Sequence, residues 1–194
     1  MLNARILTKM HDDANAAWHT RLPLPVYNDE FLAIVLANHL ANYDLWHRED
    51  EARNPDASDA VIALVKHSID ALNQQRNDLV ERIDVWLLDK AGTQNASAPL
   101  NSETPGAMID RLSILSLKVY HTREEALRKS ATKQHRTKNR DRLKVLLEQQ
   151  SDLAGCLDAL WAQVAAGTRR FKLYRQMKMY NDPELNPVLY GRTS

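Results

Sequence analysis

Apolar residues recur along most of this chain three or four positions apart, which is the spacing of amphipathic helices. Capping residues, prolines and glycines divide this pattern into five expected helices. The helices cover about 28–53, 59–89, 104–128 or beyond, 139–166 and 168–180. A leader ending in RLPLPVYND precedes them, and residues 91–104 are expected to form a flexible loop. The pattern predicts an all-α fold, a single domain over 1–194 built as a bundle of about five helices.

One face of the expected helix 59–89 carries six polar residues at helical spacing. A solvated face usually consists of Glu, Lys, Gln and Arg, whereas Asn and Asp are poorer helix formers. The stripe consists of Lys66, Asp70, Asn73, Asn77, Glu81 and Asp84. We therefore expect this face to line a site that holds a polar group.

The expected helix 28–53 also places polar residues on its apolar face. Asn42, Glu49 and Arg53 share that face with Trp46. A buried charge costs several kcal/mol unless it is paired or ligates something. If the two helices pack as an antiparallel hairpin joined by the turn at 54–58, they enclose a polar interior seam.

Four carboxylates of this seam are candidate catalytic and metal-binding residues. Glu49, Asp50, Glu81 and Asp84 offer hard oxygen ligands suited to Mg²⁺ or Mn²⁺. The alternative is an interhelical network of salt bridges and amide hydrogen bonds that fixes the register of the helices. Both interpretations stay open, although the uncharged amides in the stripe suit a ligand better than an ion-pair zipper.

Further candidates for ligand binding lie in the C-terminal half. The expected helix 104–128 carries polar residues on one face, and the run RRFKLYRQMKMYNDPELNPVLY mixes cations that bind phosphate with aromatic rings that stack. An ordinary hydrogen-bonded histidine at His121, and a tail that packs its aromatic rings on the bundle, are the alternatives. The full set of ligand-binding candidates is Asn42, Trp46, Arg53, Lys66, Asp70, Asn73, Asn77, Asp110, Arg111, His121, Lys172, Tyr174, Lys178, Tyr180 and Asn181.

Charge and composition narrow the classes of function. The 26 Lys and Arg residues against 25 Asp and Glu give a net charge of +1, which argues against a protein committed to nucleic acid or anionic membranes. The segment 123–144 is locally basic, so nucleic-acid binding through it is a secondary hypothesis. The longest apolar run, FLAIVLA, is too short to insert into a membrane. A single cysteine, Cys156, and no recognisable export signal favour a cytoplasmic location.

Four blocks of the sequence resemble the bacterial domain-of-unknown-function family 4254. They are LWHREDEAR, NQQRNDLVERID, ETPGAMIDRLSILSLKVYH and KLYRQMKMYNDPELNPVLY, and the resemblance extends over about 38–190. Members of this family are similar to proteins found beside cell-envelope glycosyltransferase genes. The resemblance therefore implies a link to sugar or lipopolysaccharide metabolism.

A second, weaker resemblance concerns chemistry. The run VERIDVWLL is similar to the Glu-x-x-Asp helix of the all-α nucleoside triphosphate pyrophosphohydrolases, such as the MazG-like enzymes. That resemblance implies Mg²⁺ held by acidic pairs on two helices. Glu81 and Asp84 match the second pair, whereas Glu49 and Asp50 depart from the Glu-x-x-Glu of the first.

Together these features predict a protein that binds or hydrolyses a phosphorylated small molecule such as a nucleotide or nucleotide sugar, with a homodimer as the expected assembly. A divalent metal and the phosphate would occupy an interhelical pocket capped by the C-terminal segment, with Arg53, Lys66 and Lys178 on the phosphate. If the protein is an enzyme, we expect a metal-dependent hydrolase of the pyrophosphohydrolase type. The alternative is a non-catalytic accessory protein whose partner belongs to an envelope glycosyltransferase pathway.

Overall fold

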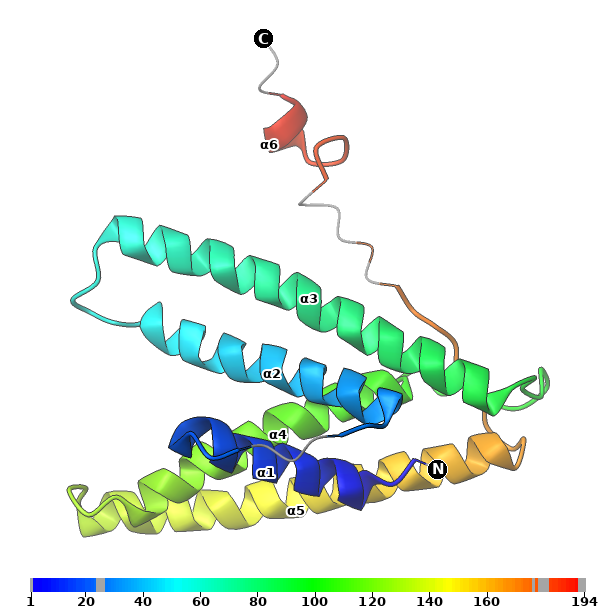
Figure 1. Ribbon diagram of the computed structural model, residues 1–194, viewed down its shortest axis with the longest axis horizontal. Helices are drawn as coiled ribbons and strands as arrows, with labels where there is room; N and C mark the ends of the chain where they lie inside the picture. The colour runs from blue at the N-terminus through cyan, green and yellow to red at the C-terminus, as the bar shows by residue number, and fades with distance from the viewer. Residues whose placement is uncertain (1, 24–26, 176, 178–181, 192–194) are drawn as a thin grey trace.

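The computed structural model describes residues 2–23, 27–175, 177 and 182–191, and in them the chain is built of helices (Figure 1). The helices are α1 (Ala4–Thr20), α2 (Glu30–Glu51), α3 (Asp59–Ala91), α4 (Pro105–Leu127), α5 (Lys133–Ala165) and the short α6 (Pro187–Tyr190). The described residues form no strand, only an isolated bridge between Leu100 and Arg170. The all-α bundle is therefore confirmed. Among these helices, none has the length and apolar character needed to cross a membrane.

Side-chain caps begin the helices where the sequence predicts them. Asp29 accepts a hydrogen bond from the Leu32 amide at the start of α2, and Thr104 accepts one from the Ala107 amide at the start of α4. Each bond satisfies an amide that has no partner within the helix. Helix α5 begins earlier than predicted because Thr132 caps it, and its first turns are polar and largely exposed. An apolar pattern does not reveal such turns.

Two predicted segments are wrong. The expected leader contains α1, whose buried residues Leu7, Met10, Ala14 and Ala17 recur at helical spacing. The expected helix 168–180 is not formed by its described residues up to 175.

The segment after α5 stays extended because its backbone bonds to the loop before α4. The Arg170 amide donates to the Pro99 carbonyl and the Arg170 carbonyl accepts from the Asn101 amide, at 3.1 and 2.7 Å. Gln94 bonds to both the amide and the carbonyl of Phe171, each at 3.0 Å. A helix over 168–180 would withdraw these backbone groups from the loop.

The bundle consists of two helix pairs, α2 with α3 and α4 with α5, and of α1, which packs on α4, α2 and α5 (Figure 1). Helix α4 also contacts α2 and α3, so it lies between the two pairs. All five long helices contribute to one apolar core. Its most deeply buried side chains include Leu7, Met10, Val35, Ile83, Leu87, Ile109, Leu112, Leu157 and Phe171. The central place of α4 puts its polar residues against α2 and α3 on one side and α1 on another.

Candidate functional site

A cavity of about 340 Å³ opens where α2, α3 and α4 meet. Its walls combine charged, amide and aromatic side chains with a few aliphatic ones. The lining residues are Asn42, Leu45, Trp46, Glu49, Asp50, Arg53, Asn73, Arg76, Ile114 and Leu117. Six of the residues predicted from the sequence therefore meet here, namely Asn42, Trp46, Glu49, Asp50, Arg53 and Asn73.

A buried hydrogen-bond network stands beside this cavity and joins α2 to α4. Asp110 accepts from the side-chain amides of Asn38 and Asn42, at 3.0 and 2.8 Å, and Asn42 also donates to the Ser113 hydroxyl at 3.0 Å. His39 bonds to the same hydroxyl at 2.7 Å. The polar seam predicted between α2 and α3 is thus built mainly between α2 and α4. The reason is that α4 packs against α2 and brings Asp110 and Ser113, one helical turn apart, to face it.

Arg76 is the lining residue that sequence reasoning missed. Its Nε lies 3.8 Å from the Asp110 carboxylate, which is an ion pair without a hydrogen bond. That nitrogen is buried and has no hydrogen-bond partner among the described residues. Arg76 follows Asn73 by three positions, so the two share a helix face, and this spacing is the signal that was available.

The mouth of the cavity carries an exposed ion pair. Arg53 donates to the Glu49 carboxylate at 2.7 Å, and both residues lie near the C-terminal end of α2. Asp50 lies beside them and is exposed. The Arg53–Glu49 pair joins residues four positions apart at the end of α2, so it is not the interhelical pairing of the register-fixing alternative. Asp50 lines the same cavity beside this pair.

The structure does not bring the four predicted metal ligands together. Asp84 of α3 is buried against the first turn of α4, where its carboxylate accepts a hydrogen bond from the Gly106 amide at 2.6 Å. A side chain on Gly106 would lie 2.7 Å from both Asp84 Oδ1 and the Val80 carbonyl, so only glycine fits this approach. In the antiparallel α2–α3 hairpin, Asp84 lies at the opposite end from Glu49 and Asp50. Glu81 lies close enough to raise the pKa of Asp84 and does not line the cavity.

The pH dependence of folding tests the environment of Asp84. Burial raises the pKa of its carboxyl from 3.8 to about 6, against the opposing hydrogen bonds from Thr104 and Gly106. The folded state binds this proton more tightly than the unfolded state does, so proton binding stabilises the fold. This stabilisation is complete below the unfolded pKa and is lost as the pH rises through about 6. Asp84→Asn has no group that titrates at this position, so its free energy of unfolding does not fall with this carboxyl. From about pH 4.5 to about pH 7.5 the stability of the variant relative to the wild type should therefore increase by about 2 kcal/mol. Urea denaturation at both pH values measures this gain, and parallel profiles would contradict it.

The remaining predicted residues lie elsewhere. Lys66 and Asp70 are exposed on α3, and Asn77 is half-buried outside the cavity. Arg111 points to another groove, between α4 and α5, and bonds to Glu103 at 2.5 Å. The predicted C-terminal cap is not seen in the described residues, because the extended segment carries Lys172 and Tyr174 as exposed side chains that do not line the cavity. Lys178, Tyr180 and Asn181 lie outside the described residues.

His121 is not a lone histidine. It meets His19 of α1 and His47 of α2, and one ring nitrogen from each lies within 4.8 Å of the others. We call these three residues the histidine cluster. Among the described residues this is the one group of three or more His, Cys, Asp and Glu side chains close enough to share a metal ion. Sequence reasoning missed His19 and His47. The spacing of eight between His11 and His19 on α1, and between His39 and His47 on α2, is a weak signal that each pair shares a helix face.

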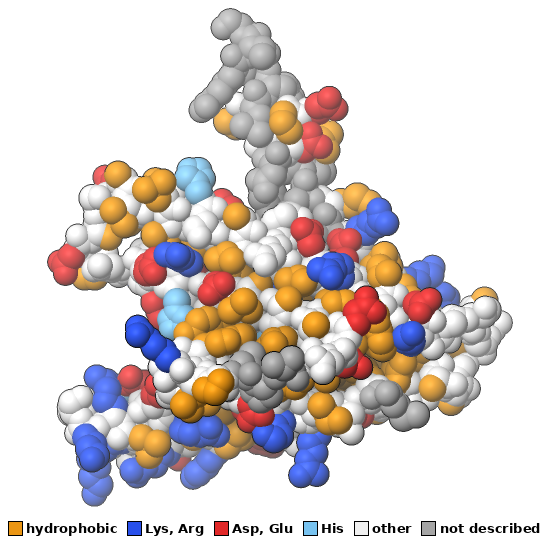
Figure 2. Space-filling view, in the orientation of Figure 1, with side chains coloured by type: hydrophobic (Ala, Val, Ile, Leu, Met, Phe, Trp, Pro, Cys, Tyr) orange, Lys and Arg blue, Asp and Glu red, His pale blue; other side chains and the backbone are white. Residues whose placement is uncertain are grey.

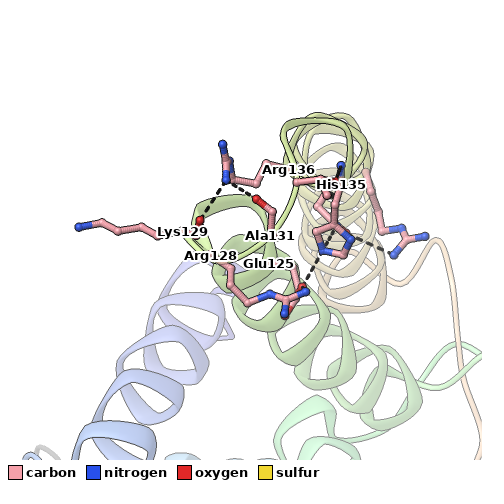
Figure 3. A network of polar contacts seen from close by, with 9 residues as sticks. Glu125, Arg128, Lys129, Ala131, His135 and Arg136 are labelled. Carbon is pink, nitrogen blue, oxygen red and sulfur yellow. Dashed lines mark hydrogen bonds and ion pairs between the residues drawn. The ribbon is translucent and has the colours of Figure 1, made fainter.

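The basic segment 123–144 forms the end of α4, a turn and the start of α5 (Figure 3). Glu125 accepts from His135 at 2.6 Å and pairs with Arg128 at 2.9 Å. Arg136 donates to the Lys129 and Ala131 carbonyls. Some of the basic side chains therefore hold the turn, while others cover the lower edge of the face in Figure 2, on the α5 side. Nucleic-acid binding through this segment stays a prediction.

Comparison with known proteins assigns the chain to a family. No curated protein and no solved structure matches it. The model of one family, described as a protein of unknown function (DUF4254), matches residues 32–173. This range contains all but the first two residues of α2 and the whole of α3, α4 and α5, and with them the cavity, the Asp110 network and two members of the histidine cluster. The chain therefore belongs to the DUF4254 family.

Proposed function

We propose that the cavity between α2, α3 and α4 binds a phosphorylated small molecule of the nucleotide or nucleotide-sugar class. The observation that carries this proposal is the Arg76 guanidinium, which lines the cavity while its buried Nε lacks a hydrogen-bond partner among the described residues. A buried donor without a partner costs free energy, and an oxyanion would satisfy it. Asp110 holds the guanidinium in place at 3.8 Å without engaging this donor.

The other lining groups suit the same class of ligand. Asn73 presents an amide on the helix face of Arg76, and Arg53 adds a second cation at the mouth. Trp46 supplies an aromatic wall, which favours a ligand that carries a ring. The combination of two guanidinium groups, amides and an indole is typical of sites that bind a phosphate together with an organic ring.

A divalent ion fits the proposal at the mouth of the cavity. Glu49 and Asp50 are the two predicted metal ligands that line it, and Mg²⁺ is often bound by one or two carboxylates together with substrate phosphates. Asp84 is already engaged at the start of α4, so a four-carboxylate centre of the pyrophosphohydrolase type has no support here. Ligand binding, with Mg²⁺ or Mn²⁺ as a bridge to phosphate, is the function that this geometry supports best.

Calorimetric titration with ADP and with UDP-glucose, each in the presence of Mg²⁺, tests the proposal. Arg76→Ala should weaken binding about 10- to 100-fold, because a hydrogen bond to a charged group is worth about 1.5 to 3 kcal/mol. Arg76→Lys should lie in between, since lysine keeps the charge and loses the planar fork. Arg82→Ala removes an exposed arginine of the same helix that does not line the cavity, and it should bind like the wild type.

The outcome separates the proposal from its alternative. Equal affinity of Arg76→Ala and wild type, with both folded by circular dichroism, would show that the cavity is not the binding site. If the wild type binds neither probe at millimolar concentration, the non-catalytic accessory protein becomes the better hypothesis, and the Asp110 network is then a device that fixes helix register.

A further inference from the structure

The histidine cluster lies where three helices converge, and the Trp46 ring separates it from the cavity described above. His19 comes from the last turn of α1, His47 from the C-terminal part of α2 and His121 from α4. None of the three lines the α2–α3–α4 cavity. Helices far apart in the sequence therefore bring three imidazole rings to one point, within 4.8 Å of one another at the candidate ligand atoms.

The hydrogen bonds of these rings fix which nitrogen is available. His19 Nδ1 lies 2.7 Å from the Asn15 carbonyl, and His121 Nδ1 lies 3.0 Å from the Glu124 carboxylate. A carbonyl and a carboxylate only accept hydrogen bonds, so both Nδ1 atoms carry a proton, and in the neutral form of each ring the lone pair is on Nε2.

The Nε2 atoms are the anomaly. Those of His19, His47 and His121 are all buried, and none has a hydrogen-bond partner among the described residues. A buried polar atom without a partner costs free energy, and three in one place require an explanation. A cation shared by three lone pairs would satisfy all of them at once.

Aromatic rings surround the cluster and hold it in position. Trp46 stacks on His121 with ring centroids 4.8 Å apart, and Tyr120 stacks on His19 at 4.3 Å. Tyr43 meets the edges of His19 and His47. These ring contacts help to orient the three imidazoles, as neighbouring groups do around known metal sites.

We propose that His19, His47 and His121 bind a divalent transition-metal ion of the zinc class through their Nε2 atoms. Three histidines leave one position of a tetrahedral site open for water or another ligand. Ideal geometry, with metal–nitrogen bonds of about 2.0 Å, brings the nitrogens to about 3.3 Å from one another, so small ring rotations complete the site. Glu124 orients His121 through Nδ1, as carboxylates behind metal-bound histidines do. This site shares the Trp46 ring with the wall of the proposed ligand cavity, but it uses none of the residues proposed to hold the phosphate or the divalent ion there.

Cobalt and zinc titrations test the site in the full chain with any affinity tag removed. Cys156 is exposed and could bind these ions by itself, so the background is Cys156→Ser. After treatment with a chelator, Co²⁺ should bind one per chain and give the intense visible bands of a tetrahedral complex. Zn²⁺ should displace it and raise the melting temperature through linkage.

Variants distinguish the cluster from other histidines. His47→Ala and His121→Ala should each weaken Co²⁺ binding about 100-fold or more, and Glu124→Gln should weaken it about tenfold. His67→Ala removes an exposed histidine of α3 and should bind Co²⁺ like the background protein. His47→Gln provides a second variant of similar size if His47→Ala does not fold. Any of three results would overturn the proposal: no binding, a weak octahedral spectrum, or affinity unchanged by the cluster variants.

Discussion

Phe171→Ala is expected to lower the free energy of unfolding by about 3 to 5 kcal/mol, the usual cost of removing a buried phenyl ring. The side chain is 1% exposed and belongs to the apolar core, although it lies beyond the last long helix. Its amide and carbonyl both bond to Gln94, so the ring and the backbone together attach this segment to the loop before α4. Urea denaturation followed by circular dichroism measures the loss.

Tyr174→Ala is the matched control for this prediction. Tyr174 is an aromatic residue of the same segment, but its side chain is 50% exposed. Its replacement should change the free energy of unfolding by less than about 0.5 kcal/mol. Equal losses in the two variants would contradict the view that burial of the Phe171 ring stabilises the attachment of this segment.

Phe171 also shows where sequence reasoning about the fold succeeds and where it stops. Helices α2, α3 and α4 could be predicted because each has an apolar stripe and a recognisable cap. Residues 168–180 show helical spacing as well, yet the bonds of Arg170 and Phe171 to the loop 94–101 override it. Those bonds depend on two segments about 70 positions apart, and no local pattern contains them.

The first helix was missed for a different reason. Its buried face carries alanines and the polar residues His11 and Asn15 alongside Leu7 and Met10, so the helical spacing was present in the sequence but was not built of large apolar residues alone. Small and amide side chains suit this face because α1 packs closely on α4, where Asn15 bonds to Ser116. The histidine cluster was missed as a consequence, since one of its members lies on this helix.

The candidate site could be predicted in part. Polar residues on the apolar faces of α2 and α3 indicated a polar interior, and Asn42, Trp46 and Asn73 do line one cavity. The polar stripe on α3 predicted too much, because in the first turns of α3 it is Val65 and Ile69 that pack against Leu45 of α2, while the polar residues face away. Its first members, Lys66 and Asp70, are exposed, and its last, Asp84, serves the start of α4. The spacing of residues in the sequence shows which of them share a helix face, but it does not show along which turns a neighbouring helix packs on that face.

Asp110→Ala is expected to cost about 2 to 4 kcal/mol of folding free energy. The change removes the acceptor of two buried amides, on Asn38 and Asn42, and each buried donor left without a partner costs about 1 to 3 kcal/mol. Asn42 keeps its bond to the Ser113 hydroxyl, which moderates the loss. Arg76 loses the carboxylate that lies 3.8 Å from its Nε.

Asp110→Asn separates the two contributions, because it keeps an oxygen that accepts from both amides and removes only the charge. If the amide bonds carry the stability, this variant loses about 1 kcal/mol or less in urea denaturation, well short of the alanine variant. If Asp110→Asn and Asp110→Ala lose the same free energy of unfolding, the pairing of Asp110 with Arg76 is instead the main source of this stability. The first result also bears on the cavity, since a guanidinium whose ion pair contributes little to folding is free to exchange Asp110 for a phosphate. If the amide bonds to Asp110 hold α2 against α4, Arg76 can turn from Asp110 to a bound phosphate while the two helices stay packed.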